Sequence, residues 1–543
     1  MKNQEKIESL VQELAKKRIK SHEDFLFLIK KLTKNYQISP PPIVKILSSY
    51  KLMRSHQKIR RSWFFEKLLK KRPVRSLSGV AVISVLTKPY PCPGNCLYCP
   101  IEKGIPKSYL SGEPAVERAK TLKFDPCLQV KKRIEMLQKQ GHSTDKIELI
   151  IIGASWTAYP KNYQEWFIRR CFEGANLTNG KKQIANSLWQ AQKINEKAKN
   201  RIIGISVETR PDLITPEEIK RMRQLGITKI ELGIQTLDEK ILTKNKRGHG
   251  LKEIISATKL LKDAGFKICY HIMPNLYGSN PKKDLEMFKK LFSDENFRPD
   301  YLKIYPCVVT RGSKLYKLWQ KKKYKPYSEK TLINLLIKMK TIVPPYVRII
   351  RVFRDIPSDK IEGGVKISNL REVVKKEMEK KGLKCKCIRC REIKDLPLTN
   401  YNLHLMKRTY NASGGKEIFL SFEDTKNDRI LAFLRLRLST NNGELEQITN
   451  KIPVLKNAAI IRELHTYGEL VEIGKKKKTA SQHKNLGKKL VKEAERIVKD
   501  IARHQKNKNT RIKKIAVIAG IGSRQYWRKL GYKLRGTYMV KNI

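Results

Sequence analysis

Three closely spaced cysteines give the strongest chemical signal in the sequence. Cys92, Cys96 and Cys99 have the spacing C-x3-C-x2-C and directly follow residues 79–86, an apolar run typical of a buried strand. Three thiolates can bind three irons of a [4Fe–4S] cluster, which normally takes four thiolate ligands. The fourth iron would then lack a protein ligand, and an open coordination position is what a catalytic metal centre needs.

Two simpler interpretations compete with the open cluster: a zinc knuckle, and a disulfide with one spare thiol. Structural zinc sites usually have four ligands in two separated pairs. Residues 1–20 lack the apolar core of a signal peptide, so we expect a cytoplasmic protein with reduced thiols. The pattern favours the cluster, and with Tyr98 before the last cysteine the loop closely resembles that of radical S-adenosylmethionine (SAM) enzymes. In that superfamily SAM occupies the open iron.

Composition indicates a multidomain protein with an anionic partner. A chain of 543 residues is too long for one core and predicts three or four domains. Its net charge is +65, from 116 Lys and Arg against 51 Asp and Glu. A lysine-rich proteome could explain part of this excess, and the remainder predicts a phosphate-binding surface, hence a nucleic-acid partner. No apolar run reaches the length of a membrane span.

Residues 1–75 are predicted to form a helical, basic region. Its basic residues are interrupted by the aromatic residues 63–65, and such interleaving suits RNA, because phosphates attract the cations and exposed bases stack on the rings. The alternative is a solvated helix face whose aromatic residues belong to a core. The residues predicted to contact nucleic acid are Lys58, Arg60, Arg61, Lys70, Lys71, Arg72 and Arg75.

Residues 76–355 alternate between strand-like and helical patterns. This alternation predicts an α/β fold with a parallel sheet and right-handed crossovers, either open or closed into a barrel. The expected strands are 79–86, 146–152, 201–207, 229–234, 267–272 and 301–305.

Polar residues follow several of these strands. The cysteine loop follows the first strand, Glu208 and Arg210 the third, and Gln235 the fourth. Carboxyl ends of parallel strands meet at one edge of a sheet, so we expect these side chains to share a site. For SAM, Glu208 and Gln235 could bond the ribose diol or the amino group, and Arg210 could pair with the carboxylate. Alternatively, Arg210 and Asp212 form a structural ion pair at the start of the next helix.

A second cysteine group lies in the predicted linker, residues 356–395. Cys385, Cys387 and Cys390 have the spacing C-x-C-x2-C, which suits zinc. The fourth ligand is not local, and His404 is a candidate by its position in the sequence alone. The alternative is a set of reduced thiols without a metal.

Residues 396–543 change to hairpin and helix patterns. A run from Gln482 to Lys488 opens a long amphipathic helix after a strand-rich stretch, an arrangement that can bind a pyrophosphate through backbone N–H groups. The GNAT acetyltransferase fold has Q-x-x-G-x-G/A at this point. Asn485 replaces the first glycine, and Asn tolerates a positive φ better than most residues.

Several sequence blocks resemble the catalytic subunit of Elongator (Elongator protein 3) in its archaeal and bacterial form. They are CPGNCLYCP, GHSTDKIELIIIG, ISVETRPD, ELGIQT and GGVKISNLRE, and the resemblance extends from about residue 50 to the C-terminus. It implies a partial (β/α) radical SAM barrel, an N-terminal tRNA-binding region, a zinc-type linker and a C-terminal GNAT α+β domain. Residues 153–156 depart from the family's Gly-Gly-Thr-Phe.

The resemblance also implies roles for individual residues. Tyr526 or Tyr538 would protonate the departing thiolate, because Trp527 replaces the second tyrosine of the family's Tyr-Tyr pair. The main chain from Glu463 to Thr466 would contact acetyl-CoA. The full implied acetyl-CoA site comprises Lys146, Glu463, Leu464, His465, Thr466, Gln482, Leu486, Gly487, Lys488 and Trp527.

The implied activity is carboxymethylation of carbon five of the tRNA wobble uridine, with acetyl-CoA and SAM as co-substrates and a [4Fe–4S] cluster and zinc as metals. The expected partners are a tRNA anticodon stem-loop, an electron donor, and either a second copy of the chain or accessory subunits. Two other functions fit the same features. One is a protein lysine acetyltransferase with the barrel as a scaffold, and the other is a non-catalytic RNA-binding protein that senses acyl-CoA.

Overall fold

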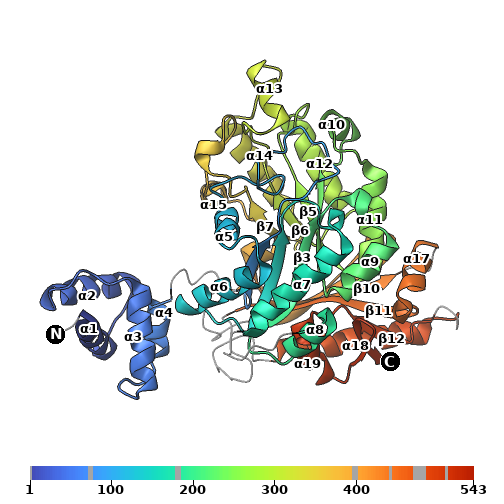
Figure 1. Ribbon diagram of the computed structural model, residues 1–543. Coiled ribbons are helices and arrows are strands. Elements are labelled where there is room, and N and C mark those ends of the chain that lie inside the picture. Colours follow the sequence, from blue (N-terminus) through green and yellow to red (C-terminus); the bar gives the residue numbers. More distant parts are fainter. Residues whose placement is uncertain are drawn as a thin grey trace.

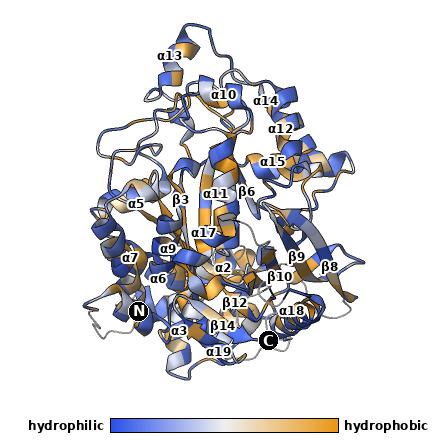
Figure 2. Ribbon diagram, turned by 90° about the vertical axis from the view of Figure 1, so that its right-hand side faces the viewer, coloured by the Kyte–Doolittle hydropathy of each residue, from blue (hydrophilic) through white to orange (hydrophobic). Residues whose placement is uncertain are grey.

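The computed structural model describes residues 3–70, 78–177, 185–393, 402–439, 443–468, 485–507 and 511–543 (Figure 1). Within these ranges the chain forms an N-terminal helical unit and two seven-stranded sheets. Figure 2 shows hydrophobic residues concentrated in the centre of the molecule, around α11 and β12, with hydrophilic residues towards the periphery. None of the described helices is long and apolar enough to cross a membrane.

The first sheet is parallel throughout, and its strands follow chain order. This confirms the α/β prediction. The outer strands β1 and β7 do not pair with each other, so the sheet is a partial barrel with an open edge. Its strands are β1 (Ala81–Leu86), β2 (Lys146–Ile152), β3 (Arg201–Thr209), β4 (Lys229–Gln235), β5 (Lys267–Ile272), β6 (Tyr301–Ile304) and β7 (Arg348–Val352).

The helices that cover the barrel begin at recognisable signals. Asp125, Thr215 and Asn280 each accept a hydrogen bond from a backbone N–H of the first turn, and each is followed by proline at the first helical position. The helices are α5 (Pro114–Thr121), α6 (Pro126–Lys139), α7 (Lys161–Asn176), α8 (Leu188–Asn195), α9 (Pro216–Gln224), α10 (Glu239–Lys244), α11 (Leu251–Asp263), α12 (Pro281–Ser293), α13 (Lys314–Gln320), α14 (Glu329–Thr341), α15 (Leu370–Lys380) and α16 (Ile388–Arg391).

The second sheet is mixed, in the order β13-β14-β12-β11-β10-β9-β8, and only β11 and β12 run parallel. Helix α18 packs across β9, β10 and β11. The elements are β8 (Leu403–Ala412), β9 (Gly415–Asp424), β10 (Arg429–Ser439), β11 (Ala458–Thr466), β12 (Lys514–Val517), β13 (Lys533–Arg535), β14 (Tyr538–Asn542), α17 (Gly443–Lys451), α18 (Leu486–His504) and α19 (Arg524–Arg528).

The two sheets meet at an interface built from buried ion pairs. Arg462 contacts Asp300, with an Nη2–Oδ1 distance of 2.5 Å, and Arg437 contacts Asp263, with an Nη2–Oδ1 distance of 2.7 Å. All four side chains are fully buried. Removing one partner of such a pair leaves a charge without compensation, at a cost of about 3–5 kcal/mol. The ion pairs therefore hold the two sheets in one mutual orientation.

The N-terminal helices α1 (Asn3–Lys16), α2 (His22–Asn35), α3 (Ile43–Ser55) and α4 (Trp63–Leu68) have a core of their own. Figure 1 shows this helical unit standing beside the barrel. Helix α3 contacts α6, where the Lys51 ammonium donates to the Gln138 carbonyl at 3.0 Å. A core of its own is typical of a unit that folds beside the barrel and is not part of the barrel core.

Candidate active site at the mouth of the barrel

The cysteine loop follows β1 at the carboxyl end of the parallel sheet. Backbone hydrogen bonds hold it on two sides: Leu97 N–H donates to the Asn245 carbonyl at 3.2 Å, and Leu315 N–H donates to the Leu97 carbonyl at 2.8 Å. The loop is thus tied to the segment after α10 and to the start of α13. Cys96 is buried, whereas Cys92 and Cys99 are half-buried.

Arginine side chains make this loop electropositive. Burial alone would raise the pKa of Cys96, but that pKa is lowered because the guanidinium of Arg247 donates to its sulfur at 3.0 Å and Arg210 lies nearby. Burial raises the pKa of Cys99 to about 12. A thiolate stabilised by fixed cations is the form that binds iron. The donor set therefore fits an iron–sulfur cluster, and Arg247 is a residue that sequence reasoning missed.

Arg210 forms the ion pair with Asp212 that the structural alternative predicted. Its guanidinium forks onto Asp212, with a shortest N–O distance of 3.0 Å, and Nη2 also donates to the Arg247 carbonyl at 2.7 Å. The remaining nitrogen, Nη1, is buried without a hydrogen-bond partner, and a Cβ at Gly94 would lie 2.4 Å from it. Gly94 therefore lets the cysteine loop approach a free donor. A carboxylate beside the cysteines would satisfy that donor.

Glu208 and Gln235 line one cavity of about 670 Å³ that opens at the carboxyl ends of the strands. Tyr109 donates to the Glu208 carboxylate at 2.9 Å, and the Oε1 atom of Gln235 is buried without a partner. The cavity continues along the open edge of the barrel, between Val82 on β1 and Ile350 on β7. The structure therefore brings Glu208 and Gln235 together, while Arg210 lies beside the cysteine loop instead of in the cavity lining. The volume is typical of small-molecule sites.

A buried charge network forms part of the wall of this cavity. The ammonium of Lys303 contacts Glu231 and lies 3.4 Å from Glu208, and His271 Nε2 lies 2.9 Å from Glu231. Burial would raise the pKa of Glu231, but the Lys303 and His271 side chains hold that pKa well below its usual range. Glu231, Cys269 and His271 cluster closely enough to suggest a metal site, but Lys303 already supplies the cation. Sequence reasoning did not single out Lys303.

The predicted acyl-CoA loop forms the N-terminus of α18. Asn485 adopts a left-handed conformation with φ 57°, as the replacement of glycine by asparagine predicts. A Cβ at Gly487 would lie 3.1 Å from the Tyr526 hydroxyl and 3.6 Å from the Thr466 Oγ atom. Leu464 borders the same point. The structure thus brings β11, α18 and α19 together at this point. Helix α18 has 19 residues, begins at Leu486 and includes Gly487 and Lys488 in its first turn. Its N-terminus is suited to a pyrophosphate.

The two candidate proton donors have different surroundings. Tyr526 is 40% exposed, and burial of its ring raises its pKa to about 12, so the phenol is protonated at neutral pH. Tyr538 is fully buried, and its hydroxyl donates to the Ala264 carbonyl at 2.7 Å. The geometry therefore supports Tyr526 and gives no support to Tyr538. Trp527 packs into the core against Tyr532, with ring centroids 5.3 Å apart.

Three other predicted acetyl-CoA residues lie where the second sheet meets the barrel. The Glu463 carboxylate accepts hydrogen bonds from Arg435 at 3.0 Å and from the Tyr301 hydroxyl, so only its main chain remains for a ligand. His465 Nε2 lies 2.8 Å from the Ser78 carbonyl, just before β1. Lys146 begins β2, and burial lowers its pKa. The contact of His465 with Ser78 connects the second sheet to the amino end of the barrel strands.

The second cysteine group is compact. The sulfur atoms of Cys385, Cys387 and Cys390 all lie within 4.8 Å of one another. Hydrogen bonds from Cys385 and Cys390 hold the pKa of Cys387 well below its usual value. Three adjacent sulfurs around one stabilised thiolate fit zinc. Among the described residues the cluster contains no fourth His, Cys, Asp or Glu ligand, and His404 lies apart on exposed β8.

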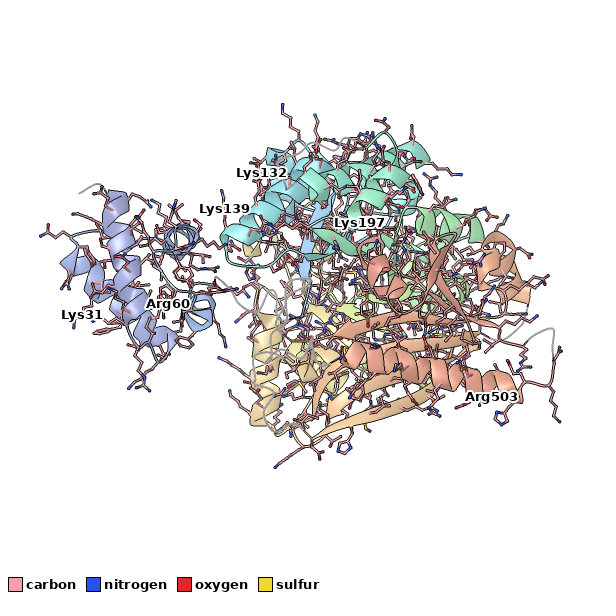
Figure 3. The ribbon with its side chains drawn as sticks, turned by 90° about the horizontal axis from the view of Figure 1, so that it is seen from below. Lys31, Arg60, Lys132, Lys139, Lys197 and Arg503 are labelled. Atoms are coloured by element: carbon pink, nitrogen blue, oxygen red, sulfur yellow. The ribbon has the colours of Figure 1, made fainter. Side chains whose placement is uncertain are left out.

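The residues predicted to contact RNA fall into three groups. Lys58 and Arg60 are exposed and Lys70 is half-buried, whereas Arg61 forms an ion pair with Glu66 at 3.2 Å. Of the neighbouring aromatics, Phe65 lies in the helical core, and Phe64 is 48% exposed. Figure 3 shows Lys31 and Arg60 on the helical unit, Lys132 and Lys139 on helix α6, and Lys197 in the turn after α8. Lys71, Arg72, Arg75 and the acyl-CoA residue Gln482 lie outside the described residues.

Comparisons with known proteins agree with this geometry. Residues 90–291 match the radical SAM superfamily, and residues 299–380 match the radical SAM C-terminal domain. A tRNA uridine(34) acetyltransferase of Methanocaldococcus jannaschii is 46% identical over 489 residues, covering 88% of this chain and 87% of that protein. Elongator complex protein 3 of Homo sapiens is 38% identical over 493 residues, covering 88% and 86%.

A solved structure of the archaeal Methanocaldococcus infernus Elp3, which carries an N-terminal deletion, is similar with a TM-score of 0.72 and 42% identity. The match covers 86% of this chain and 100% of that structure. A match of this extent is longer than the barrel alone.

Proposed function

The chain belongs to the Elongator protein 3 family of radical SAM enzymes, and on this premise we propose that it carboxymethylates carbon five of the wobble uridine in a tRNA anticodon. The co-substrates would be SAM and acetyl-CoA. Hydrogen abstraction from the acetyl methyl group would be followed by addition of that carbon to the uridine. The adduct would lose one proton to water and one electron to a one-electron acceptor such as the oxidised cluster, and thioester hydrolysis would leave a carboxymethyl group. The names of the relatives support the uridine as substrate and an acyltransferase activity.

One observation carries the proposal. The cysteine loop follows β1 of the first sheet, the predicted acyl-CoA loop lies beside β11 of the second sheet, and the two sheets contact each other next to β1. His465 on β11 bonds to Ser78, and β1 continues from there to the cysteine loop. These contacts support the proposal that both chemistries would take place on one rigid body. A cluster bound at Cys92, Cys96 and Cys99, together with SAM, would supply a 5′-deoxyadenosyl radical.

Residues of this chain would divide the remaining work. Glu208 and Gln235 would bond the SAM hydroxyl or amino groups in the cavity, and the free nitrogen of Arg210 would receive the carboxylate. Tyr526, protonated at neutral pH, would donate its proton to the CoA thiolate. Lys303 would form ion pairs with Glu208 and Glu231 within the barrel.

The open edge of the barrel would admit the RNA base. The cavity there is lined by several basic side chains, so a phosphate backbone can follow it while one base is splayed inward. They are Arg118, Arg133, Arg351, Arg354 and Arg389.

The decisive experiment is anaerobic reconstitution with iron and sulfide, followed by mass spectrometry of nucleosides from tRNA treated with SAM, a reductant and acetyl-CoA. We expect 5-carboxymethyluridine at the wobble position and formation of 5′-deoxyadenosine. The matched control is Cys96→Ala, which should yield neither product. A protein lysine acetyltransferase would acetylate peptides in both forms, and a non-catalytic sensor would bind tRNA without forming 5′-deoxyadenosine. Either result would overturn the proposal.

A further inference from the structure

We propose that a second cavity, walled by Trp166, Tyr163 and Phe124 at the end of α5, binds the base of a nucleotide next to the target uridine. The inference rests on the proposed function in one respect, namely that the substrate is RNA. It adds a base-binding site at a distance from the reacting groups.

The cavity has rigid aromatic walls. Its volume is about 560 Å³, and Trp166 on α7 is 37% exposed in its lining. The Trp166 and Tyr163 ring centroids lie 5.6 Å apart. Tyr163 in turn stacks on Tyr159 at 5.1 Å, and the Tyr159 hydroxyl is hydrogen bonded to Thr87 at 2.7 Å. The walls are thus held in place before any ligand arrives, which lowers the entropic cost of stacking a base.

The rim of the cavity is positively charged. The Lys88 ammonium lies 4.9 Å from the Tyr163 ring centroid, and Lys123 is exposed beside it. Asp125 is the acid among the described lining residues. Its charge is compensated by Arg170, at an N–O distance of 3.1 Å, and its carboxylate also accepts a hydrogen bond from the Leu128 N–H at the start of α6. Aromatic walls with two lysines at the mouth suit a nucleotide, whose base stacks while its phosphate meets the cations.

The cavity lies close to the proposed reaction site. Helix α5 separates the two cavities: Arg118 lines the first, and Thr121, three residues later, lines this one. Three residues of helix rise only about 4.5 Å. Along the chain, Lys88 precedes Cys92 by four residues, so the two lie at most about 14 Å apart. One or two nucleotides of an unstacked strand can cover such a distance.

A protein partner, such as an electron carrier, fits this surface less well. Stable protein interfaces need roughly 800 Å² on each partner, centred on a broad patch. Here the exposed aromatic surface is concave and of the size of one small molecule. The shape favours a single base over a docked protein.

The test uses the full-length protein and a wobble-uridine anticodon stem-loop RNA with 2-aminopurine placed singly at each loop position beside the target. In Trp166→Ala we expect the dissociation constant of the RNA to rise about 5- to 150-fold, the loss of one aromatic–base stack. The quenching of 2-aminopurine at one loop position should disappear as well. Trp166→Phe should retain both properties in large part.

Trp189 provides a matched control. It is a 66% exposed tryptophan on α8 with the Lys193 ammonium 4.7 Å from its ring, but it lines neither of the two cavities. Trp189→Ala should leave the dissociation constant within about twofold, within the range of surface changes.

The outcomes separate the two proposals. Unchanged RNA affinity and quenching in Trp166→Ala, with uridine modification intact in the wild type, would overturn the base-binding site alone. If Trp166→Ala slowed turnover with a protein reductant but not with dithionite, and RNA binding stayed normal, the surface would be an electron-donor site and the inference wrong. Failure of the wild type to modify uridine despite normal quenching would reject the proposed function and leave the base site standing.

Discussion

The two cysteine groups occupy opposite ends of the same sheet. Cys92, Cys96 and Cys99 follow β1 at the carboxyl end, beside an open cavity. The other group lies at the amino end, where Ile388 N–H donates to the carbonyl of Val347, just before β7. In parallel barrels the carboxyl end holds the chemistry and the amino end contributes stability.

The comparison teaches that surroundings, more than thiol number, decide what a cysteine triplet can do. Arg247 provides a permanent cation for Cys96, and Tyr98 of the same loop lines an open cavity. Cys387 is instead stabilised by the other two thiols of its own cluster and is fully buried. The first arrangement suits an open metal centre, and the second suits a closed one.

The largest expected effect is at the first cysteine triplet, Cys92, Cys96 and Cys99, which we call the open triplet. Cys96→Ala should abolish 5′-deoxyadenosine formation and the brown absorbance of the reconstituted protein, because one of three ligands is lost. The melting temperature of the metal-free protein should stay nearly unchanged. Retention of full iron content after this substitution would contradict the assignment of this triplet as the cluster site.

Tyr526, which is partly exposed, and Tyr538, which is fully buried, allow the same comparison between an accessible and a buried side chain. Tyr526→Phe should slow acetyl-CoA thioester cleavage roughly 100-fold or more, because a proton donor in contact with the acyl-CoA loop is removed. Tyr538→Phe should leave cleavage almost unchanged and cost about 1 kcal/mol of unfolding free energy, the value of one buried hydrogen bond. Cleavage is followed by thiol release, and stability by urea denaturation. The reverse pattern would transfer the role to Tyr538.

At the second triplet, Cys385, Cys387 and Cys390, which we call the closed triplet, a substitution should mainly lower the stability of the folded protein. Cys387→Ser should lower the zinc content measured by mass spectrometry and reduce the melting temperature by roughly 5–10 °C, since zinc binding contributes folding free energy. Radical chemistry at 25 °C should continue with the remaining folded protein. If this variant kept its melting temperature but lost 5′-deoxyadenosine formation, the two triplets would have exchanged roles.

The smallest effect concerns acid stability at the open end. Burial would raise the pKa of Asp212, but His249 and Arg210 lower it to about 2. The stability from this carboxylate is therefore complete above its unfolded pKa near 3.9 and is lost as the pH falls towards 2. Asp212→Asn should flatten the pH dependence of the urea midpoint between about pH 4 and 2. An unaltered slope would mean that Asp212 titrates normally.

Local patterns predicted the barrel well. The bounds of β2 and β5 agree with the predicted strands 146–152 and 267–272, because isoleucine-rich runs fit strands buried between helices and the barrel interior. Glu208 and Gln235 were found for the same reason, although the structure places them within the carboxyl ends of β3 and β4 and not after these strands. Strand β8 was missed because its alternating residues are largely exposed, as expected at a sheet edge.

Contacts between distant segments could not be predicted. Arg247 lies 151 residues from Cys96 in the sequence and belongs to no motif, so nothing local connects the two. The hydrogen bond of Tyr538 spans 274 residues, and it alone makes that hydroxyl unsuitable as a donor. Such partners are set by the packing of the two sheets, which a single sequence does not reveal.

The buried arginines between the two sheets would restrict how an acyl group could move between the two proposed sites. Because Arg437 and Arg462 form buried ion pairs with carboxylates on the barrel, we expect the two sheets to keep their mutual orientation during a catalytic cycle. Under the proposed function, a thioester bound at α18 would have to reach the radical through movement of its own pantetheine arm. Cutting the chain between the halves would strand those charges, so we expect neither fragment to persist as a folded enzyme.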